Sequence, residues 1–144
     1  MNVVDAITIA APPERVWEVY ADVERWPSWT ASVTSLELLD GDELAIGGRA
    51  RIKQPRFPTL VWTVTALDPG RSWTWVTHAP GATTTASHTL RRLDDGSTHV
   101  EQSITQAGVV GALVGLLTRR LTRRYLAMEA AGLAAQATRR VTTA

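Results

Sequence analysis

The sequence contains no cysteine, one phenylalanine and a single lysine among its 15 basic residues. The absence of cysteine excludes disulfide bonds, thiolate catalysis and zinc–thiolate sites. The formal net charge is +1, so no overall field favours nucleic acid or an acidic substrate. Tryptophan, in contrast, is abundant, with six residues beside that one phenylalanine and two tyrosines.

Long apolar runs are also missing. The most apolar stretch, AGVVGALVGLL at 107–117, is much shorter than the roughly 20 residues of a membrane span. The first residues, MNVVDAITIAAPPE, lack a charged leader followed by an apolar core, so no signal peptide is predicted. We therefore expect a cytoplasmic protein without stable membrane insertion. At 144 residues and 44% hydrophobic composition, the chain is predicted to form one domain over 1–144.

The order of periodic segments predicts an α+β fold. Val3–Ala10 alternates as a strand, and Pro12-Pro13 opens a helix over 12–23, after which Pro27 leaves 25–29 as a turn or a second short helix. Strand patterns then follow to residue 107. Turn chemistry falls at Gly41, Gly47-Gly48, 68–70 and 94–97, so the segments 59–79 and 84–106 are predicted to be hairpins.

After Gly108 the period changes to that of a helix. Residues 109–141 contain no proline and are rich in leucine, alanine and arginine, which predicts a helix about 45 Å long that covers the sheet. Its expected apolar stripe is Leu113, Leu117, Leu121, Met128 and Ala135. Two glycines near its start, Gly111 and Gly115, are interpreted as points of close approach to the sheet or of movement at a cavity entrance.

Strand phase predicts which side chains face this helix. The outer face takes Arg49, Arg51 and Lys53. The inner face takes Leu60, Trp62, Val64 and Ala66, together with Trp73 and Trp75. Several polar residues share the inner phase: Gln54, His88 and Gln102, with Tyr125 from the helix. An apolar interior that carries a few convergent polar groups is typical of a small-molecule site.

Five stretches in succession resemble the SRPBCC superfamily, and within it the polyketide cyclase/dehydrase branch. They are PPERVWEVYADVERWPSW, GGRARIKQPRFP, WTVTALDPGRSWTW, SHTLRRLDDGSTHV and LTRRLTRRYLAMEAAGL. The resemblance implies a helix-grip fold, in which a seven-stranded antiparallel sheet and two short helices after the first strand enclose a long C-terminal helix and a deep apolar cavity. It also implies that Trp26 and Trp29 wall or cap one end of that cavity. Relatives include polyketide cyclases, steroid and lipid carriers and plant hormone receptors.

Three functions remain open from the sequence. The first is binding of a hydrophobic small molecule, such as a lipid, polyketide or isoprenoid, by residues Trp26, Trp29, Gln54, Trp62, Trp75, His88, Gln102, Leu117, Leu121 and Tyr125. The second is a cyclase or dehydratase with His88 as acid–base and Tyr125 polarising a carbonyl. No carboxylate is paired with a histidine in the pattern. The third is a partner-binding domain with a filled core.

No metal site or cofactor is predicted, because His78, His88 and His99 lie on different strands without ligand spacing. The arginines at 119, 120, 123 and 124 are the one concentrated charge. We interpret them as a solvated helix face that Glu129 partly compensates, with contact to anionic headgroups during ligand loading as the alternative. Nucleic acid is disfavoured because the aromatic residues are predicted to lie inside. Homodimerisation is compatible with the sequence.

Overall fold

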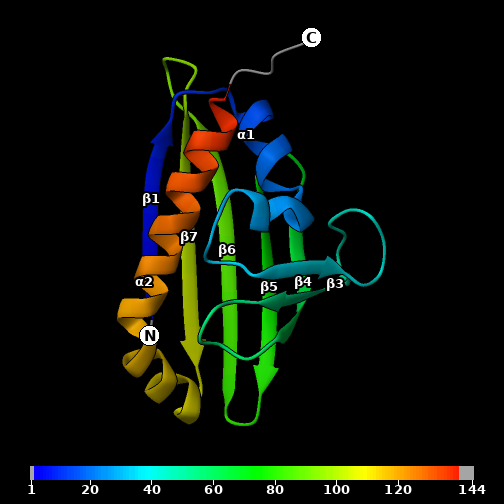
Figure 1. Cartoon of the computed structure of the whole chain (residues 1–144), viewed down its shortest axis with the longest axis vertical. Coiled ribbons are helices and arrows are strands. Elements are labelled where there is room, and N and C mark those ends of the chain that lie inside the picture. The colour runs from blue at the N-terminus through cyan, green and yellow to red at the C-terminus, as the bar shows by residue number, and fades with distance from the viewer. Residues whose placement is uncertain (1, 140–144) are drawn as a thin grey trace.

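A computed structural model describes residues 2–139. One seven-stranded antiparallel sheet with the order β1-β7-β6-β5-β4-β3-β2 forms the body of the molecule (Figure 1). The elements in chain order are β1 (Asn2–Ile9), α1 (Pro13–Tyr20), η1 (Val23–Ser28), β2 (Ser35–Leu38), β3 (Arg49–Lys53), β4 (Leu60–Asp68), β5 (Ser72–Ala79), β6 (Ala82–Arg92), β7 (Thr98–Ala107) and α2 (Val109–Ala137). This is the α+β helix-grip arrangement that the sequence predicts.

The hairpins β4–β5 and β6–β7 turn where the sequence predicts. At the first, the Arg71 amide donates to the Asp68 carbonyl at 2.9 Å, and at the second, the Leu93 amide donates to the Ser97 carbonyl at 2.9 Å. Gly96 in the second turn has a φ of 85°, a left-handed conformation that glycine adopts without strain. The first strand, β1, forms one edge of the sheet and pairs with β7, so that Asn2 lies opposite Thr105.

The helical segment after β1 consists of two short helices. Helix α1 begins at Pro13, where the missing proline N–H costs nothing, and a separate 3₁₀ helix, η1, contains Pro27. Together they lie beside the C-terminal half of α2 (Figure 1). Arg15 of α1 donates to the carbonyls of Gln136 and Ala137, and so joins α1 to the end of α2.

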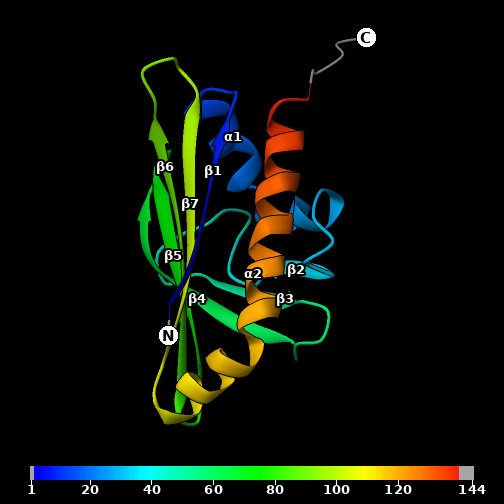
Figure 2. The ribbon, with the colours of Figure 1, turned by 90° about the vertical axis from the view of Figure 1, so that its left-hand side faces the viewer.

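Helix α2 lies along one face of the sheet, with its first turns leaning toward the sheet end (Figure 2). The amides of Val110 and Gly111 both donate to the Gly81 carbonyl, at 3.0 and 3.1 Å, which fastens the start of the helix to the β5–β6 turn. Gly111 lies against the sheet, as the sequence suggests: a Cβ there would be in van der Waals contact with Ala82, at 3.4 Å from its Cα.

The predicted apolar stripe of α2 is wrong along its whole length: Leu121 and Met128 are half-buried, and Ala135 at its end is exposed. Leu113 is 57% exposed and Leu117 is 75% exposed, whereas the buried positions are Gly111, Gly115, Tyr125, Leu126, Glu129, Ala130, Leu133 and Ala137. These buried positions recur at three- and four-residue steps, as one helix face does. Gly111 and Gly115 lie on the face turned to the sheet, and Leu113 and Leu117 lie on the opposite face.

Strand phase is confirmed for the outer face and for most of the inner face. Arg49 and Arg51 are exposed and pair with Asp40 and Glu37. The expectation that Ala66 faces inward is wrong, because the register of β4 against β5 shifts between Val64 and Ala66. A bulge of this kind moves all later residues to the opposite face.

Candidate functional site

A cavity of about 260 Å³ lies between the inner face of the sheet and α2. Its wall is mostly apolar, with side chains from β3 to β7, η1 and α2. Seven of the residues that the sequence proposes for the site line it: Trp26, Gln54, Trp62, Trp75, His88, Gln102 and Tyr125. Three do not: Trp29, Leu117 and Leu121. The β-strand period therefore located the site better than the helix period did.

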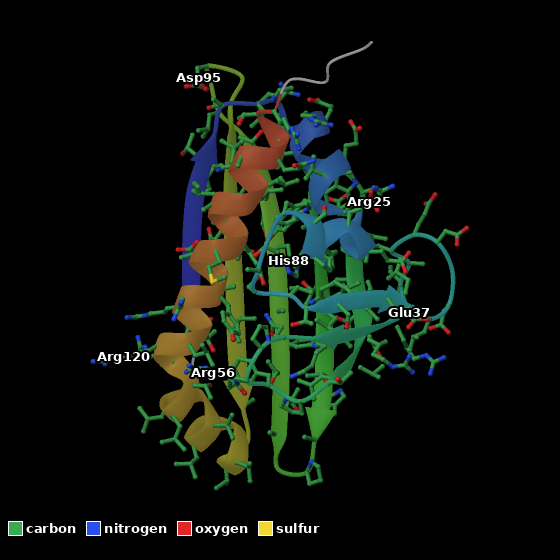
Figure 3. All side chains as sticks on the ribbon, viewed as in Figure 1. Arg25, Glu37, Arg56, His88, Asp95 and Arg120 are labelled. Atoms are coloured by element: carbon green, nitrogen blue, oxygen red, sulfur yellow. The ribbon has the colours of Figure 1, made fainter. Side chains whose placement is uncertain are left out.

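His88 lies on the inner face of β6 in the middle of the sheet (Figure 3). Its ring stacks on Trp73 with centroids 3.9 Å apart and planes 12° from parallel. The Nδ1 atom lies 3.2 Å from the Trp73 carbonyl oxygen, and since a carbonyl can only accept, Nδ1 carries the proton. Burial lowers the pKa of His88 from 6.5 to about 3, so the ring is neutral and Nε2 is unprotonated at pH 7.

Gln102 is the cross-strand neighbour of His88 on β7. Its Oε1 accepts a hydrogen bond from the Tyr20 hydroxyl at 2.8 Å, and its Nε2 donates to the Leu126 carbonyl at 3.1 Å. The side chain thus joins α1, the sheet and α2 through fully buried contacts. Its orientation is fixed before any ligand arrives.

Glu129 is the ionisable residue of the cavity wall that the sequence analysis missed. It is 6% exposed and lines the cavity, so its interpretation as a surface charge that compensates the arginines is wrong. The Ser32 hydroxyl donates to its Oε1 at 3.4 Å. Burial raises the pKa of Glu129 from 4.5 to about 8, with the nearby Asp5 acting in the same direction, so the neutral acid predominates at pH 7. Its spacing of four residues from both Tyr125 and Leu133 was the available signal.

Aromatic rings pack around His88. The rings of Trp26 and Trp75 lie 5.9 and 5.5 Å from it between centroids. Tyr20 stacks on Trp26 at 5.5 Å, while the Trp26 indole N–H donates to the Tyr20 carbonyl at 2.8 Å. This rigid cluster forms the wall of the cavity beside α1 and η1.

Trp29 contacts the helix rather than the cavity. The nearest approach is at Gly132 of α2, where an added Cβ would lie 2.1 Å from the Trp29 carbonyl oxygen. Of the two residues expected to wall the cavity, Trp26 lines it. Trp29 does not, and instead fixes η1 against α2.

The loop between β3 and β4 covers one side of the cavity. The Tyr125 hydroxyl donates to the Pro55 carbonyl, and the Phe57 ring meets the Tyr125 ring edge-on at 5.8 Å. At the start of α2, Val110 and Val114 line the cavity and are also 46% and 37% exposed. The cavity therefore reaches solvent near the first turns of α2.

A seven-stranded antiparallel sheet and a long C-terminal helix with an apolar cavity between them define a helix-grip protein. Residues 1–138 match the family described as polyketide cyclase / dehydrase and lipid transport. The chain belongs to this family, as the resemblance in its sequence indicates.

One curated relative, from Streptomyces halstedii and provisionally named as a polyketide cyclase, is 36% identical over 70 residues. That match covers 49% of this chain, and it spans about half, 53%, of the relative's length. Solved structures confirm the fold. A Helicobacter pylori protein is 14% identical with a TM-score of 0.80 over 95% of this chain and 88% of its own. A Thermus thermophilus protein is 19% identical with a TM-score of 0.74 over 95% and 97%. Ara h 8.0201 is 13% identical with a TM-score of 0.63 over 92% and 97%.

Neither a metal centre nor a membrane span emerges from the part of the chain that the structure describes. Residues 2–139 contain no group of three histidine, aspartate or glutamate side chains placed to hold a metal ion. None of the helices in this range is both long and apolar enough to cross a bilayer.

Proposed function

We propose that the protein binds a small, largely apolar molecule, of lipid, polyketide or isoprenoid type, in the cavity between the sheet and α2. The observation that carries this proposal is the cavity itself, about 260 Å³ with a mostly apolar wall. That volume is slightly below the ≈300–1,000 Å³ typical of small-molecule sites, which suits a small ligand. Membership of a family described by cyclisation, dehydration and lipid transport supports the same class of ligand.

The polar groups in the wall narrow the chemistry of the ligand. His88 offers an unprotonated nitrogen, and Glu129, as a neutral acid, offers a hydrogen-bond donor. No lysine or arginine lines the cavity among the described residues. A carboxylate buried there would lack a counter-charge, which is costly. We therefore expect neutral ligands with hydroxyl or carbonyl groups to bind better than acids of equal length.

The test compares ligands and variants. Isothermal titration of the delipidated protein against a long-chain alcohol and the corresponding carboxylate should give measurable affinity for the alcohol and at least tenfold weaker binding of the acid. Ala86→Leu, which adds carbon atoms to the cavity wall on β6, should weaken alcohol binding at least tenfold. Thr89→Leu on the same strand, but exposed, is the matched control and should not. Equal binding by both variants would contradict the cavity as the site.

Native mass spectrometry of protein purified from its own host supplies an independent test. A stoichiometric apolar adduct that extraction removes would identify the chemical class. Such an adduct on wild type but not on Ala86→Leu would locate it in the cavity. The cavity volume already disfavours the alternative of a partner-binding domain with a filled core.

A cyclase or dehydratase is the second candidate, because a neutral base and a neutral acid, His88 and Glu129, line one cavity. This pairing is the one that aldol closure or water elimination uses. However, a pKa of about 3 makes His88 a weak base, since general bases work best with pKa values near the operating pH. His88→Gln separates the two functions: it should leave binding largely intact, whereas under the second function it abolishes turnover of the extracted ligand.

A further inference from the structure

The outward face of α2 begins with an exposed apolar surface. We define the apolar end of α2 as Val109, Leu113, Leu116 and Leu117, whose exposed fractions are 89%, 57%, 61% and 75%. Their positions repeat at three- and four-residue steps, so they form one face, opposite the buried glycines. Single exposed leucines are ordinary, but four apolar side chains on one helix face form a contiguous patch that favours a contact.

The same outward face becomes cationic immediately afterwards. Arg120, Arg123 and Arg124 are exposed and continue the row of the apolar end, with Arg120 seven residues, or about 10 Å, beyond Leu113. Figure 3 shows Arg120 projecting away from α2 and from the rest of the molecule. In the described part of the chain none of these three arginines takes part in an ion pair.

Acidic groups are missing from this face. The one acidic residue of α2 is Glu129, and it is buried against Ser32 on the opposite side. A second copy of the chain on this face would bring the arginine rows together if the two helices were parallel. In an antiparallel pair it would lay the arginines of each copy on the apolar residues of the other. An anionic lipid bilayer, in contrast, offers an apolar layer beneath a layer of phosphates, in the order that the helix face presents.

We propose that the apolar end of α2 docks on the surface of an anionic lipid bilayer, with its valine and leucines among the acyl chains and Arg120, Arg123 and Arg124 on the phosphate headgroups. With the axis of α2 inclined to the bilayer, the axial rise of about 10 Å between the two parts of this face places the arginines at the headgroups when the apolar end lies among the acyl chains. The docking itself is independent of the proposed ligand.

Docking at this end also has a consequence for the cavity. Val110 and Val114, on the same turns of α2, are exposed residues of the cavity wall, as are Pro58 and Ala79. A protein seated on its apolar end therefore presents the opening of the cavity to the bilayer. An apolar molecule could then pass between the two without crossing water.

The experiment is flotation of the full chain with vesicles, without added ligand. Vesicles of phosphatidylcholine alone should bind little protein, and vesicles with one quarter phosphatidylglycerol should bind most of it, less at 0.5 M than at 0.1 M salt. Leu116→Glu/Leu117→Glu should abolish flotation; both side chains are exposed, so an unchanged circular dichroism spectrum is expected to show that the variant folds. Arg120→Gln/Arg124→Gln should weaken binding about 30-fold, the factor that follows from about 1 kcal/mol for each arginine.

The matched control is Arg25→Gln/Arg91→Gln, which removes two exposed arginines elsewhere. It should bind as wild type does. Absence of flotation, equal binding to neutral vesicles, or an equal loss in the control pair would each overturn the proposal. So would a dimer in light scattering that Leu116→Glu/Leu117→Glu dissociates, because the surface would then belong to a second copy. None of these results bears on the alcohol titration, so the two proposals fail separately.

Discussion

At the residue scale, Gly132 determines how η1 is attached to the long helix. The backbone of Trp29 approaches α2 so closely that a Cβ at position 132 would lie 2.1 Å from the Trp29 carbonyl oxygen and 3.0 Å from its Cε3 atom. The nearest atom is a backbone oxygen, which cannot move aside as the flexible end of a long side chain could. The position of η1, and with it that of Trp26 in the cavity wall, therefore depends on this glycine.

Gly132→Ala should destabilise the protein by about 1–3 kcal/mol, because the methyl group forces η1 away from α2. In an unobstructed helix the same change stabilises by roughly 1 kcal/mol, so the sign of the effect is informative. Urea unfolding followed by circular dichroism measures it. Ala131→Gly at the exposed neighbouring position is the control and should cost only the helix propensity. A more stable Gly132→Ala protein would show that no such close contact exists.

Individual site residues were predictable where a strand period held. The alternation of β6 and β7 places His88 and Gln102 on the inner face, and the structure agrees. The bulge in β4 has no turn residue to announce it, so Ala66 was assigned to the wrong face. Glu129 was missed because its buried hydrogen-bond partner, Ser32, lies almost one hundred residues away in the sequence.

At the scale of elements, the loop between β3 and β4 is fastened to α2 by one side chain. Tyr125 donates its hydroxyl hydrogen to the Pro55 carbonyl and supports Phe57 with its ring. These contacts hold the loop over the cavity. Among the described residues, this is the hydrogen bond between α2 and the loop that must break before the loop can open.

Tyr125→Phe should therefore loosen the loop without unfolding the domain. The ring contact with Phe57 remains while the hydrogen bond is lost, so the expected loss of stability is about 1 kcal/mol. Hydrogen exchange should show faster exchange confined to residues 54–59, and ligand dissociation should be faster. Tyr20→Phe, which removes the hydroxyl from Gln102 instead, is the control and should not affect the loop selectively. Uniform protection changes over the whole sheet would contradict this role.

The elements themselves were largely predictable, and the face of the long helix was not. Hairpin turns and proline positions mark the ends of strands and short helices, because those residues have local conformational requirements. In α2 the leucines have a regular spacing on the outward side, and a sequence pattern cannot tell an apolar face that meets the sheet from one that meets another partner. Gly111 and Gly115 indicate the buried side by their lack of a side chain.

At the scale of the whole molecule, two neutralised groups should shape the dependence of stability on pH. The folded protein binds a proton at Glu129 up to about pH 8, whereas the unfolded chain releases it near 4.5, so this stabilisation is lost as pH rises. In the folded protein the His88 ring stays neutral down to about pH 3, whereas in the unfolded chain it takes up a proton near pH 6.5. This stabilisation is therefore lost as pH falls. Between 4.5 and 6.5 the two trends oppose each other.

We expect the free energy of unfolding to fall by roughly 2 kcal/mol between pH 6.5 and 8. In this range the contribution of Glu129 changes with pH, whereas that of His88 is nearly constant. Urea unfolding across this range measures the decline. Glu129→Gln keeps the shape and the Ser32 contact without the titration, so its profile should be flat there. Glu101→Gln, at an exposed position of β7, should retain the decline. A decline of equal size in Glu129→Gln would assign it to other groups.

The pairing of β1 with β7 has a consequence for how the chain is made. Asn2 and Thr105 contact each other across 103 positions of sequence, and α2 packs on β1 as well. At about 5–20 residues per second, the ribosome releases β1 roughly 5–20 s before the strand it pairs with. During that interval β1 has no partner in its own sheet, and its apolar residues Val3 and Ile9, buried in the finished fold, are uncovered. This edge of the sheet therefore cannot be completed until β7 emerges.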